Sequence, residues 1–393
     1  MIHQTYGIIG ILLTIETGVL ILSSHPRFKK YFKFLPAVFW IYFLPMLAST
    51  VGLIDPHHPI YSQITTHLLP ASLFLLLIPV DLKAILKMGG LALVMFFSGS
   101  AGIILGTGVV FFFFQRWIGS EFASGFGALS ASWTGGSANM IAVKEALGTP
   151  DAVFLPMVIV DTIVPYLWMG ILVALAGWQA LYDRWNRSDV KILDEVRKKM
   201  TELVPPTRAR LNLTGVISIF MLAALGSFVS QKIGQGLPVI KDVISTYAWT
   251  IIVVSLLGLL LSLTPLRQLE NWGSSRVGYG ILYFVLTSIG AKASLENIGS
   301  SWILILAGFC IVGIHAVVLL LMSYVIKAPL FLVATASQAN IGGVASAPIV
   351  AEIYQPGCAA AGLLLAILGN IVGTYLGIVV GRFCLLVIQF PLP

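Results

Sequence analysis

The chain has 393 residues, of which 58% are hydrophobic and only 10% are charged, and its formal net charge is +7. Soluble domains carry about 25% charged residues, so this composition excludes a soluble protein and indicates one that crosses a membrane many times. The basic residues lie in short loops, as positive-inside bias places them, and the three cysteines show neither disulfide-framework nor metal-ligand spacing.

Apolar runs along the chain predict roughly ten to thirteen spans of about 20 residues each. In the first half, the runs lie at 5–24, 36–54, 61–80, 90–115, 123–146 (interrupted) and 152–180. In the second half, they lie at 212–231, 247–265, 276–293, 302–326, 330–352 (interrupted) and 358–388. The predicted fold class is therefore an all-α polytopic membrane protein.

One strongly polar stretch separates the two sets of runs. Residues 183–210 contain 13 of the chain's 39 Asp, Glu, Lys and Arg residues, and eight of these 13 are basic. This excess of positive charge favours a cytoplasmic location. We predict a first transmembrane repeat at 1–182, a charged cytoplasmic linker at 183–211 and a second transmembrane repeat at 212–393.

Each half contains one glycine-rich, polar interruption, at 130–140 and at 337–346. When the first Gly-Gly pair, 135–136, is placed over the second, 342–343, Glu145 falls over Glu352. Interruptions at matching places in two halves point to a transport site formed by discontinuous helices. We expect inverted repeats, although six spans in each half would by themselves give a parallel arrangement.

Unwound backbone within a membrane exposes carbonyl groups that can ligate a cation and amide groups that can hold an anion. Hydroxyl and amide side chains nearby would complete an oxygen-rich shell for a hard cation such as Na+. The predicted ion- and substrate-binding residues are Ser130, Thr134, Gly135, Gly136, Ser137, Asn139, Ser337, Gln338, Asn340, Gly342, Gly343 and Ser346. The alternative is that these small residues only allow helices to pack closely.

Ionisable residues inside apolar runs are further candidates, because a charge at the bilayer centre costs about 2.5–3.5 kcal/mol on insertion scales. Asp161 is the predicted charged ligand or proton acceptor. The other candidate charged contributors are Glu16, Glu145, Glu352 and Arg382. An interfacial position for Glu145, and snorkelling or pairing with Glu16 for Arg382, stay open as alternatives. His315 is predicted to be a hydrogen-bonded packing residue.

The motifs at 134–139, 342–343 and 289–292 together resemble the membrane proteins known as domain of unknown function 819 (YjcL type), over nearly the whole chain. That family resembles a distant branch of the superfamily of bile acid–sodium symporters, sodium–glutamate symporters and cation–proton antiporters. The resemblance implies a panel or scaffold domain, a core domain with two crossing discontinuous helices, and an elevator-like movement of the core. Thr134 stands where many relatives have proline, and Asp161 is single where many exchangers have a pair.

The functional prediction is a secondary active transporter, not an enzyme, for a small organic and anionic solute. Na+ is the expected coupling ion, with H+ as its alternative and no other cofactor; the resemblance suggests a muropeptide-like or carboxylate substrate. Two other functions stay open: a cation–proton antiporter that uses Asp161, and a non-transporting scaffold or sensor that relays through the linker. We expect a homodimer in the bacterial cytoplasmic membrane, in contact with lipid and not with nucleic acid.

Overall fold

The computed structural model describes residues 2–28, 32, 37–87, 89–188, 213–239, 245–292 and 301–388. No strand occurs among them, and their one isolated bridge joins Ile2 to Ile54. Seven helices in this part of the chain are long and apolar enough to cross a membrane. An eighth span results if Thr246–Ser262 and Pro265–Trp272, which are bent by 96°, count as one. The protein is therefore an all-α polytopic membrane protein.

Every predicted apolar run contains helix, because a backbone in lipid must pair its polar groups within its own segment. The continuous helices are α1 (Thr5–Ser24), α3 (Ala37–Thr50), α4 (Ile60–Leu77), α6 (Gly90–Ile118), α9 (Asp151–Leu175), α12 (Leu213–Gly236), α13 (Thr246–Ser262), α14 (Ser274–Lys292), α15 (Ser301–Ile326) and α18 (Ala359–Val387). The interrupted runs are α7 (Ala123–Gly135) with α8 (Ser137–Leu147), and α16 (Leu330–Ile341) with α17 (Gly343–Tyr354). Short helices are α5 (Leu82–Lys87), η1 (Ser120–Phe122), η2 (Ala176–Trp178), α10 (Gln179–Asn186) and η3 (Pro265–Trp272).

The chain forms two compact units, and each draws on both halves of the sequence. Unit 1 consists of Met1–Val80, Glu145–Thr162 and Ala209–Ser301; unit 2 consists of Asp81–Lys144, Ile163–Arg208 and Trp302–Pro393. Unit 1 contains α1, α3 and α4 from the first half and α12, α13 and α14 from the second. The units therefore do not coincide with the predicted repeats at 1–182 and 212–393, and the duplication itself stays a prediction.

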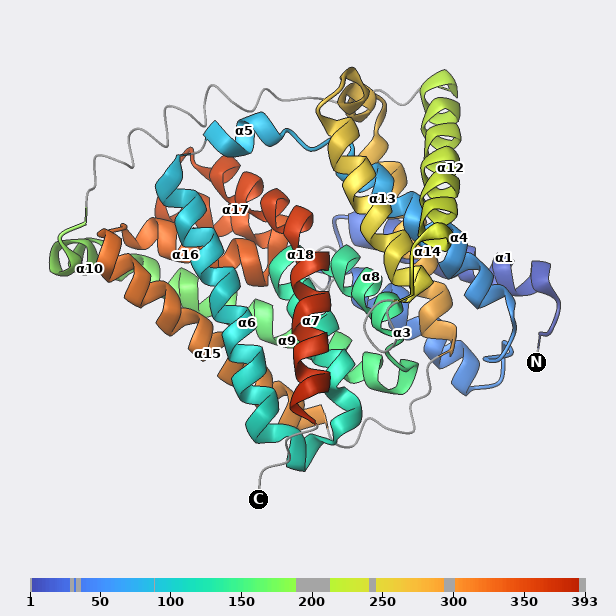
Figure 1. The fold of residues 1–393 in the computed structure, drawn as a ribbon, viewed down its shortest axis with the longest axis horizontal. Helices are drawn as coiled ribbons and strands as arrows, with labels where there is room; N and C mark the ends of the chain where they lie inside the picture. Colours follow the sequence, from blue (N-terminus) through green and yellow to red (C-terminus); the bar gives the residue numbers. More distant parts are fainter. Residues whose placement is uncertain are drawn as a thin grey trace. The chain divides into compact units, whose positions relative to one another are not determined.

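In unit 1, α4 packs against α12, α13 and α14, and α14 also contacts α3 and α1 (Figure 1). Small residues allow the close approach: a Cβ atom on Gly226 of α12 would lie 2.9 Å from the Phe74 ring of α4. The ammonium group of Lys292, at the end of α14, lies 3.4 Å from a carboxylate oxygen of Asp151. Lys292 is therefore a paired residue at a helix end.

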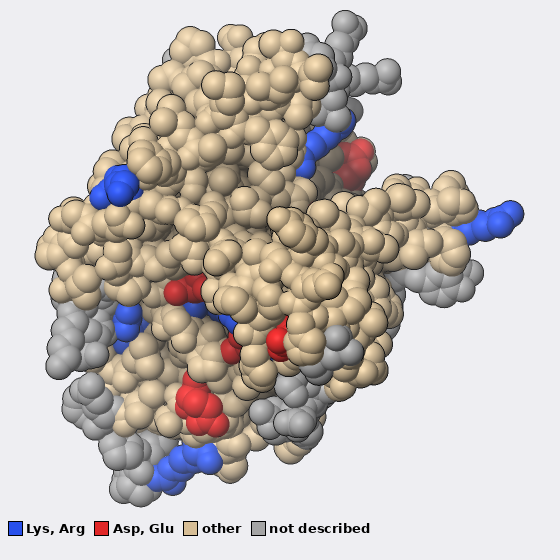
Figure 2. Space-filling view, turned by 90° about the vertical axis from the view of Figure 1, so that its right-hand side faces the viewer, with Lys and Arg blue, Asp and Glu red and all other residues tan. Residues whose placement is uncertain are grey.

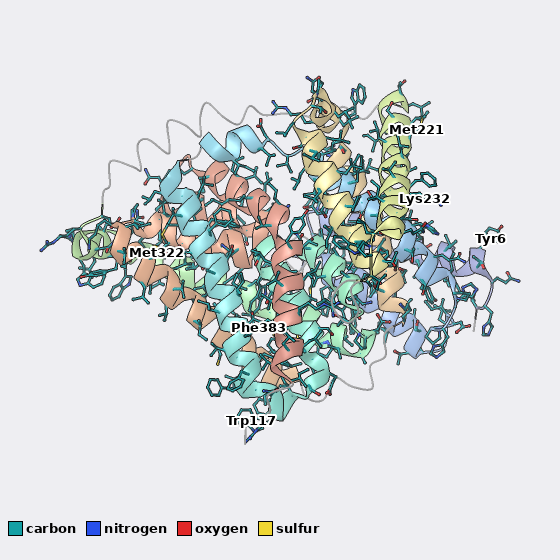
Figure 3. All side chains as sticks on the ribbon, in the orientation of Figure 1. Tyr6, Trp117, Met221, Lys232, Met322 and Phe383 are labelled. Atoms are coloured by element: carbon teal, nitrogen blue, oxygen red, sulfur yellow. The ribbon has the colours of Figure 1, made fainter. Side chains whose placement is uncertain are left out.

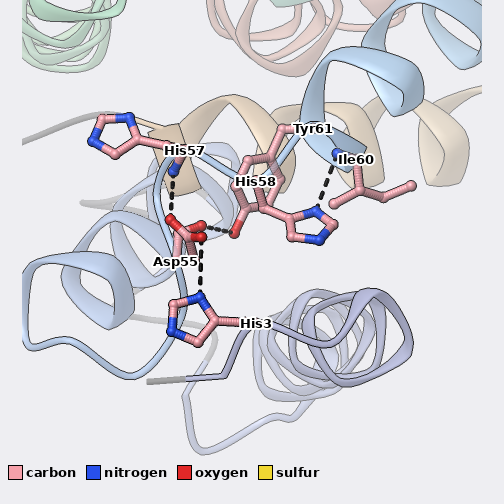
Figure 4. A network of polar contacts seen from close by, with 6 residues as sticks. All are labelled: His3, Asp55, His57, His58, Ile60 and Tyr61. Atoms are coloured by element: carbon pink, nitrogen blue, oxygen red, sulfur yellow. Dashed lines mark hydrogen bonds and ion pairs between the residues drawn. The ribbon is translucent and has the colours of Figure 1, made fainter.

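The segment before α1 is fixed to the loop between α3 and α4 by a polar network around Asp55 (Figure 4). The His3 ring nitrogen lies 3.2 Å from one carboxylate oxygen, and the backbone N–H of His57 donates to the other at 2.9 Å. The Tyr61 hydroxyl donates to the Asp55 carbonyl at 2.8 Å. The bond from the His57 backbone, and then that from His3, lower the pKa of the Asp55 carboxyl group.

In unit 2, α18 packs along α7 and also contacts α16, α17 and α6 (Figure 1). Glycines on α18 face these neighbours, and a Cβ atom on Gly373 would lie only 2.8 Å from the Gly135 Cα atom. A Cβ atom on Gly362 would meet the backbone of Ala347 and Pro348 in α17. Because no side chain intervenes, the backbone of α18 lies directly against that of α7 and of α17.

The beginning of the predicted linker belongs to unit 2. Helix α10 continues to Asn186, and Asp183 is buried within the structure. Its carboxylate accepts a hydrogen bond from the backbone N–H of Leu330 at 2.8 Å, at the start of α16. A carboxylate at this position satisfies a free amide group and suits the helix dipole. Helix α10 thus includes the first residues of the predicted linker, and residues 189–211 of that linker lie outside the described residues.

Apolar side chains dominate the surface of the transmembrane helices. On α12, Met221 is 68% exposed, and its neighbours Phe220 and Leu225 are more than half exposed (Figure 3). On the face drawn in Figure 2, charged side chains are few and scattered among uncharged ones. A contiguous apolar surface of this kind suits the hydrocarbon interior of a bilayer.

Candidate functional site at the helix breaks

The first break is at Gly136, between α7 and α8. Gly136 has φ 80° and ψ 177°, a backbone conformation that residues with a Cβ atom rarely adopt. Its N–H donates to the carbonyl of Ser132 at 2.6 Å, and its own carbonyl accepts from the N–H groups of Asn139 and Met140. Helix α7 ends at Gly135 and α8 begins at Ser137, on either side of the glycine at which the sequence predicts an interruption.

The side chain of Asn139 closes the first break. Its amide nitrogen donates to the carbonyl of Gly135 at 2.5 Å and to that of Asn370 at 3.3 Å. Its amide oxygen accepts a hydrogen bond from the hydroxyl of Thr374. Asn139 thus joins the end of α7, the start of α8 and the middle of α18, and both ends of its amide are hydrogen-bonded.

The second break lies at Gly342 and Gly343, between α16 and α17. Gly343 has φ 61°, and the N–H of Gly342 donates to the carbonyl of Gln338 at 2.8 Å. The amide nitrogen of Gln338 donates across the break to the hydroxyl of Ser346 at 2.7 Å. When the two glycine pairs are placed over one another in the sequence, Ser346 falls over Asn139, and each of these two polar side chains takes part in a hydrogen bond across its own break.

Asn340 attaches the second break to α6. Its amide oxygen accepts from the Ser100 hydroxyl at 2.8 Å, and its nitrogen donates to the carbonyls of Ala336 and Phe96 at 2.9 and 3.2 Å. The Phe96 ring lies 3.4 Å from the place where a Cβ atom on Gly369 would be, and Gly369 also faces the carbonyl of Thr134. Phe96 therefore contacts the surroundings of both breaks.

Ser337 belongs to a chain of hydrogen bonds within unit 2. The Nδ1 atom of His315 lies 2.8 Å from the carbonyl of Gly99, which can only accept, so Nδ1 carries the proton. The His315 Nε2 atom therefore accepts from the Ser337 hydroxyl at 2.9 Å, and that hydroxyl accepts from the Trp168 indole N–H at 2.9 Å. His315 is fully buried and hydrogen-bonded, as the sequence predicts.

Buried side-chain oxygens without a hydrogen-bond partner mark the same region. In the described part of the chain they include Thr134 Oγ1 at the end of α7, and Thr335 Oγ1 and Gln338 Oε1 in α16. Each of these residues is at most 1% exposed. A buried polar group without a partner costs about 1–3 kcal/mol, so such oxygens are the first candidates for contact with a bound ion or solute.

Thr335 is a residue that the sequence analysis missed. It lies three positions before Gln338 in α16, and residues at this spacing share one face of a helix. That spacing is the signal that could have identified it. Among the predicted residues, Ser130 hydrogen-bonds Thr107 at 2.8 Å, and Ser137 begins α8.

The predicted charged residues are divided between the two units. Glu16, Glu145 and Asp161 belong to unit 1, whereas both breaks lie in unit 2. Glu352 is in unit 2, where its carboxylate accepts from the backbone N–H groups of Gly357 and Ala359 near the start of α18. Arg382 is in α18, half-buried and engaged with other groups. Within unit 2, the hydrogen bonds described at the breaks involve hydroxyl, amide and carbonyl groups.

Among the described residues, no group of three or more His, Cys, Asp or Glu side chains is placed to hold a metal ion. Oxygen atoms of hydroxyl, amide and carbonyl groups are instead the ligands preferred by hard cations. The end of α7 and the end of α16 also place the negative ends of two helix dipoles at the breaks.

Comparison with known proteins supports the membrane assignment. The chain is 24% identical over 363 residues to the "Uncharacterized membrane protein YjcL" of Bacillus subtilis (strain 168). The aligned region covers 84% of this chain and 86% of that protein. Together with the long apolar helices, this similarity identifies an integral membrane protein. A family model described as "Protein of unknown function (DUF819)" matches residues 10–387 and includes both helix breaks. The chain therefore belongs to the DUF819 family of membrane proteins.

Proposed function

We propose that the protein is a secondary active transporter whose coupling ion and solute bind at the two helix breaks of unit 2. The observation that carries this proposal is the set of buried oxygens without partners, Thr134 Oγ1, Thr335 Oγ1 and Gln338 Oε1, beside two interrupted membrane helices. Discontinuous helices at corresponding positions are the recurrent construction of transporter sites.

The chemistry of the breaks favours Na+ as the coupling ion. The side chains there are hydroxyls and amides, which ligate a hard cation but do not exchange protons near neutral pH. The carboxyl ends of α7 and α16 add negative partial charge. An antiporter that uses Asp161 would instead place its proton acceptor in α9, in the part of that helix assigned to unit 1.

The same breaks suit an anionic organic solute. Helices α8 and α17 begin there, and the first amide groups of a helix have no acceptor within the helix. These N–H groups and the positive ends of the two dipoles can hold a carboxylate. We propose a small carboxylate or muropeptide-like compound, moved without chemical change and carried by movement of unit 2 within a homodimer.

The first test is thermal stability of the purified protein in NaCl, KCl, LiCl and choline chloride at equal ionic strength. Na+ at ten times its Kd would stabilise the folded protein by about 1.4 kcal/mol. Thr134→Val and Thr335→Val should each abolish the Na+-dependent rise. Thr250→Val is the matched control, because the Thr250 hydroxyl bonds its own helix in unit 1.

The second test is uptake of labelled carboxylates and muropeptides into proteoliposomes with and without an inward Na+ gradient. Gradient-dependent uptake that Thr335→Val removes and Thr250→Val retains is the expected outcome. Equal melting temperatures in all four salts, together with uptake that ignores the gradient, would disprove Na+ coupling. Absence of uptake for every solute, with a Na+-dependent melting shift, would restrict the function to ion binding.

A further inference from the structure

Glu16 is a buried acidic residue within the apolar helix α1. It is 7% exposed, and no hydrogen bond or ion pair of the described residues involves its carboxylate. A charged side chain inside a membrane span is costly unless it is paired or faces a polar cavity. Glu16 belongs to unit 1, whereas both helix breaks belong to unit 2.

Glu16 lines a cavity of about 850 Å³ within unit 1, formed by α1, α4, α12 and α14. Its walls are largely apolar and include the aromatic rings of Phe220, Phe228 and Phe284. Cavities of roughly 300–1,000 Å³ with apolar walls and a few polar groups are typical small-molecule sites. We refer to this space as the Glu16 cavity.

The neutral polar side chains of the Glu16 cavity are partly committed to helix packing. The Ser227 hydroxyl donates to the carbonyl of His67 at 3.1 Å, and the Gln231 amide donates to the carbonyl of Thr66 at 3.2 Å. Both bonds fasten α12 to α4. Because Ser227 and Gln231 already have hydrogen-bond partners, Glu16 is the buried polar side chain of this cavity that a bound ligand could pair with.

The cavity lining includes one lysine, Lys232, which is labelled in Figure 3, and one histidine, His67. The Lys232 side chain is exposed, and its ammonium group lies 5.7 Å from the centre of the Phe228 ring. Charges exposed to solvent are screened, whereas buried ones are not. No ion pair joins Lys232 to Glu16 among the described residues, so a ligand in the cavity meets a Glu16 carboxyl group with no competing ion pair, and a bound cation would favour its ionised form.

We propose that the Glu16 cavity binds a hydrophobic organic cation, namely an amine, quaternary ammonium or phosphonium compound with an apolar body. The cation would pair with the Glu16 carboxylate and lie against aromatic rings, whose faces attract positive charge. Its apolar body would fill the remainder of the cavity. An anionic lipid bound through Lys232 fits less well, because its acyl chain would lie against the buried carboxylate.

The test compares tetraphenylphosphonium with tetraphenylborate, which have nearly the same shape and opposite charge. Binding is measured by calorimetry on the full-length protein in phosphatidylcholine nanodiscs. The wild-type protein should bind the cation at least tenfold more tightly than the anion. Glu16→Gln should weaken cation binding at least tenfold, whereas Glu121→Gln, at an exposed glutamate in η1, should leave it unchanged.

A second variant tests the location independently of charge. Gly280 lines the Glu16 cavity, and no atom lies within 4 Å of the place where its Cβ would be. The first atom of the Gly280→Leu side chain therefore has room, and the variant should occupy part of the cavity and reduce cation binding at least tenfold, with no fall in melting temperature. Gly170→Leu, on α9 and equally free of neighbours within 4 Å, is the matched control.

Three results would overturn the proposal. The first is equal affinity for the cation and the anion, and the second is unchanged cation affinity in Glu16→Gln. The third is tighter binding of the anion that Lys232→Gln abolishes, which would identify an anionic lipid site instead. Lys232→Gln should otherwise leave cation affinity unchanged or raise it. None of these readouts depends on Na+, so they are separate from the test of the helix-break site.

Discussion

The amide oxygen of Asn139 accepts a hydrogen bond from the hydroxyl of Thr374, although 235 positions separate the two residues in the chain. The bond connects the start of α8 to the middle of α18. Asn139 also holds the carbonyls of Gly135 and Asn370, so one side chain fixes the geometry of the first break.

Asn139→Ala would leave these buried partners without hydrogen bonds. We expect a loss of about 2–3 kcal/mol in the free energy of unfolding, because each unpaired buried group is costly. Denaturant unfolding followed by tryptophan fluorescence measures it. Asn271→Ala, at an exposed position, should change the stability by no more than about 0.5 kcal/mol. Equal stability of the two variants would contradict a closing role for Asn139.

Gly369→Ala tests the backbone contact between α7 and α18. The added Cβ atom would meet the carbonyl oxygen of Thr134, which is backbone and cannot turn away. We expect destabilisation of about 1–3 kcal/mol. Gly313→Ala, on α15 with no atom within 4 Å of its Cβ position, should instead be neutral or stabilising by up to about 1 kcal/mol. Melting temperatures of the two proteins provide the comparison, and a tolerated Gly369→Ala would refute the contact.

Ser337 and Thr335 should show opposite behaviour. Ser337→Ala leaves His315 Nε2 and the Trp168 indole without their shared partner, so the melting temperature should fall in both NaCl and choline chloride. The difference between the two salts should persist. Thr335→Val removes an oxygen that has no partner, so the melting temperature in choline should hold while the Na+-dependent difference disappears. If the Na+-dependent difference instead disappeared in Ser337→Ala and persisted in Thr335→Val, Ser337 and not Thr335 would be the Na+ ligand.

Asp55 should make stability depend on pH in the acid range. Its pKa in the folded protein is below the ordinary value of 3.8, because hydrogen bonds from the His57 backbone and from His3 favour the carboxylate. The stabilisation is therefore present above pH 3.8 and is lost as the pH falls through the lower, folded-state pKa. The melting-temperature advantage of wild type over Asp55→Asn should be largest above about pH 5 and shrink towards pH 3. An advantage that grows on acidification would contradict the assignment.

Asp161→Asn separates the two ion-coupled functions. A symporter that binds Na+ at the breaks should keep its Na+-dependent melting shift in this variant. A cation–proton antiporter that uses Asp161 should lose exchange completely, because an amide cannot take up the proton. Dye-based measurement of H+ movement in proteoliposomes, alongside the melting shift, distinguishes them. Loss of both the H+ movement and the Na+-dependent melting shift in Asp161→Asn would favour the antiporter.

Local sequence was sufficient for the helices and their interruptions. The apolar runs predict the positions of α1, α6 and α12, and the glycine pairs predict both breaks, because these features depend on neighbouring residues alone. Local sequence was insufficient to predict the tertiary contacts between helices. Asn340 bonds Ser100, which is 240 positions away, and such pairing follows from tertiary packing.

The same limit applies to the hydrogen bonds of the predicted site residues. Asn139, Ser337 and Asn340 are predicted ligands because of their position, and the structure adds that their polar atoms join helices to one another. Thr335 looked like an ordinary helical threonine, and only its burial without a partner distinguishes it. Asp183 belonged to a charged stretch by composition, but its carboxylate is bonded to the start of α16.

The row of glycines on α18 has a consequence for how the two interrupted helices are held. Gly362 lies against α17 and Gly369 against the end of α7, and seven residues of helix measure about 10 Å. Helix α18 therefore contacts the two interrupted helices at points about 10 Å apart along its own axis, so a substitution at either glycine should disturb one break without directly touching the other.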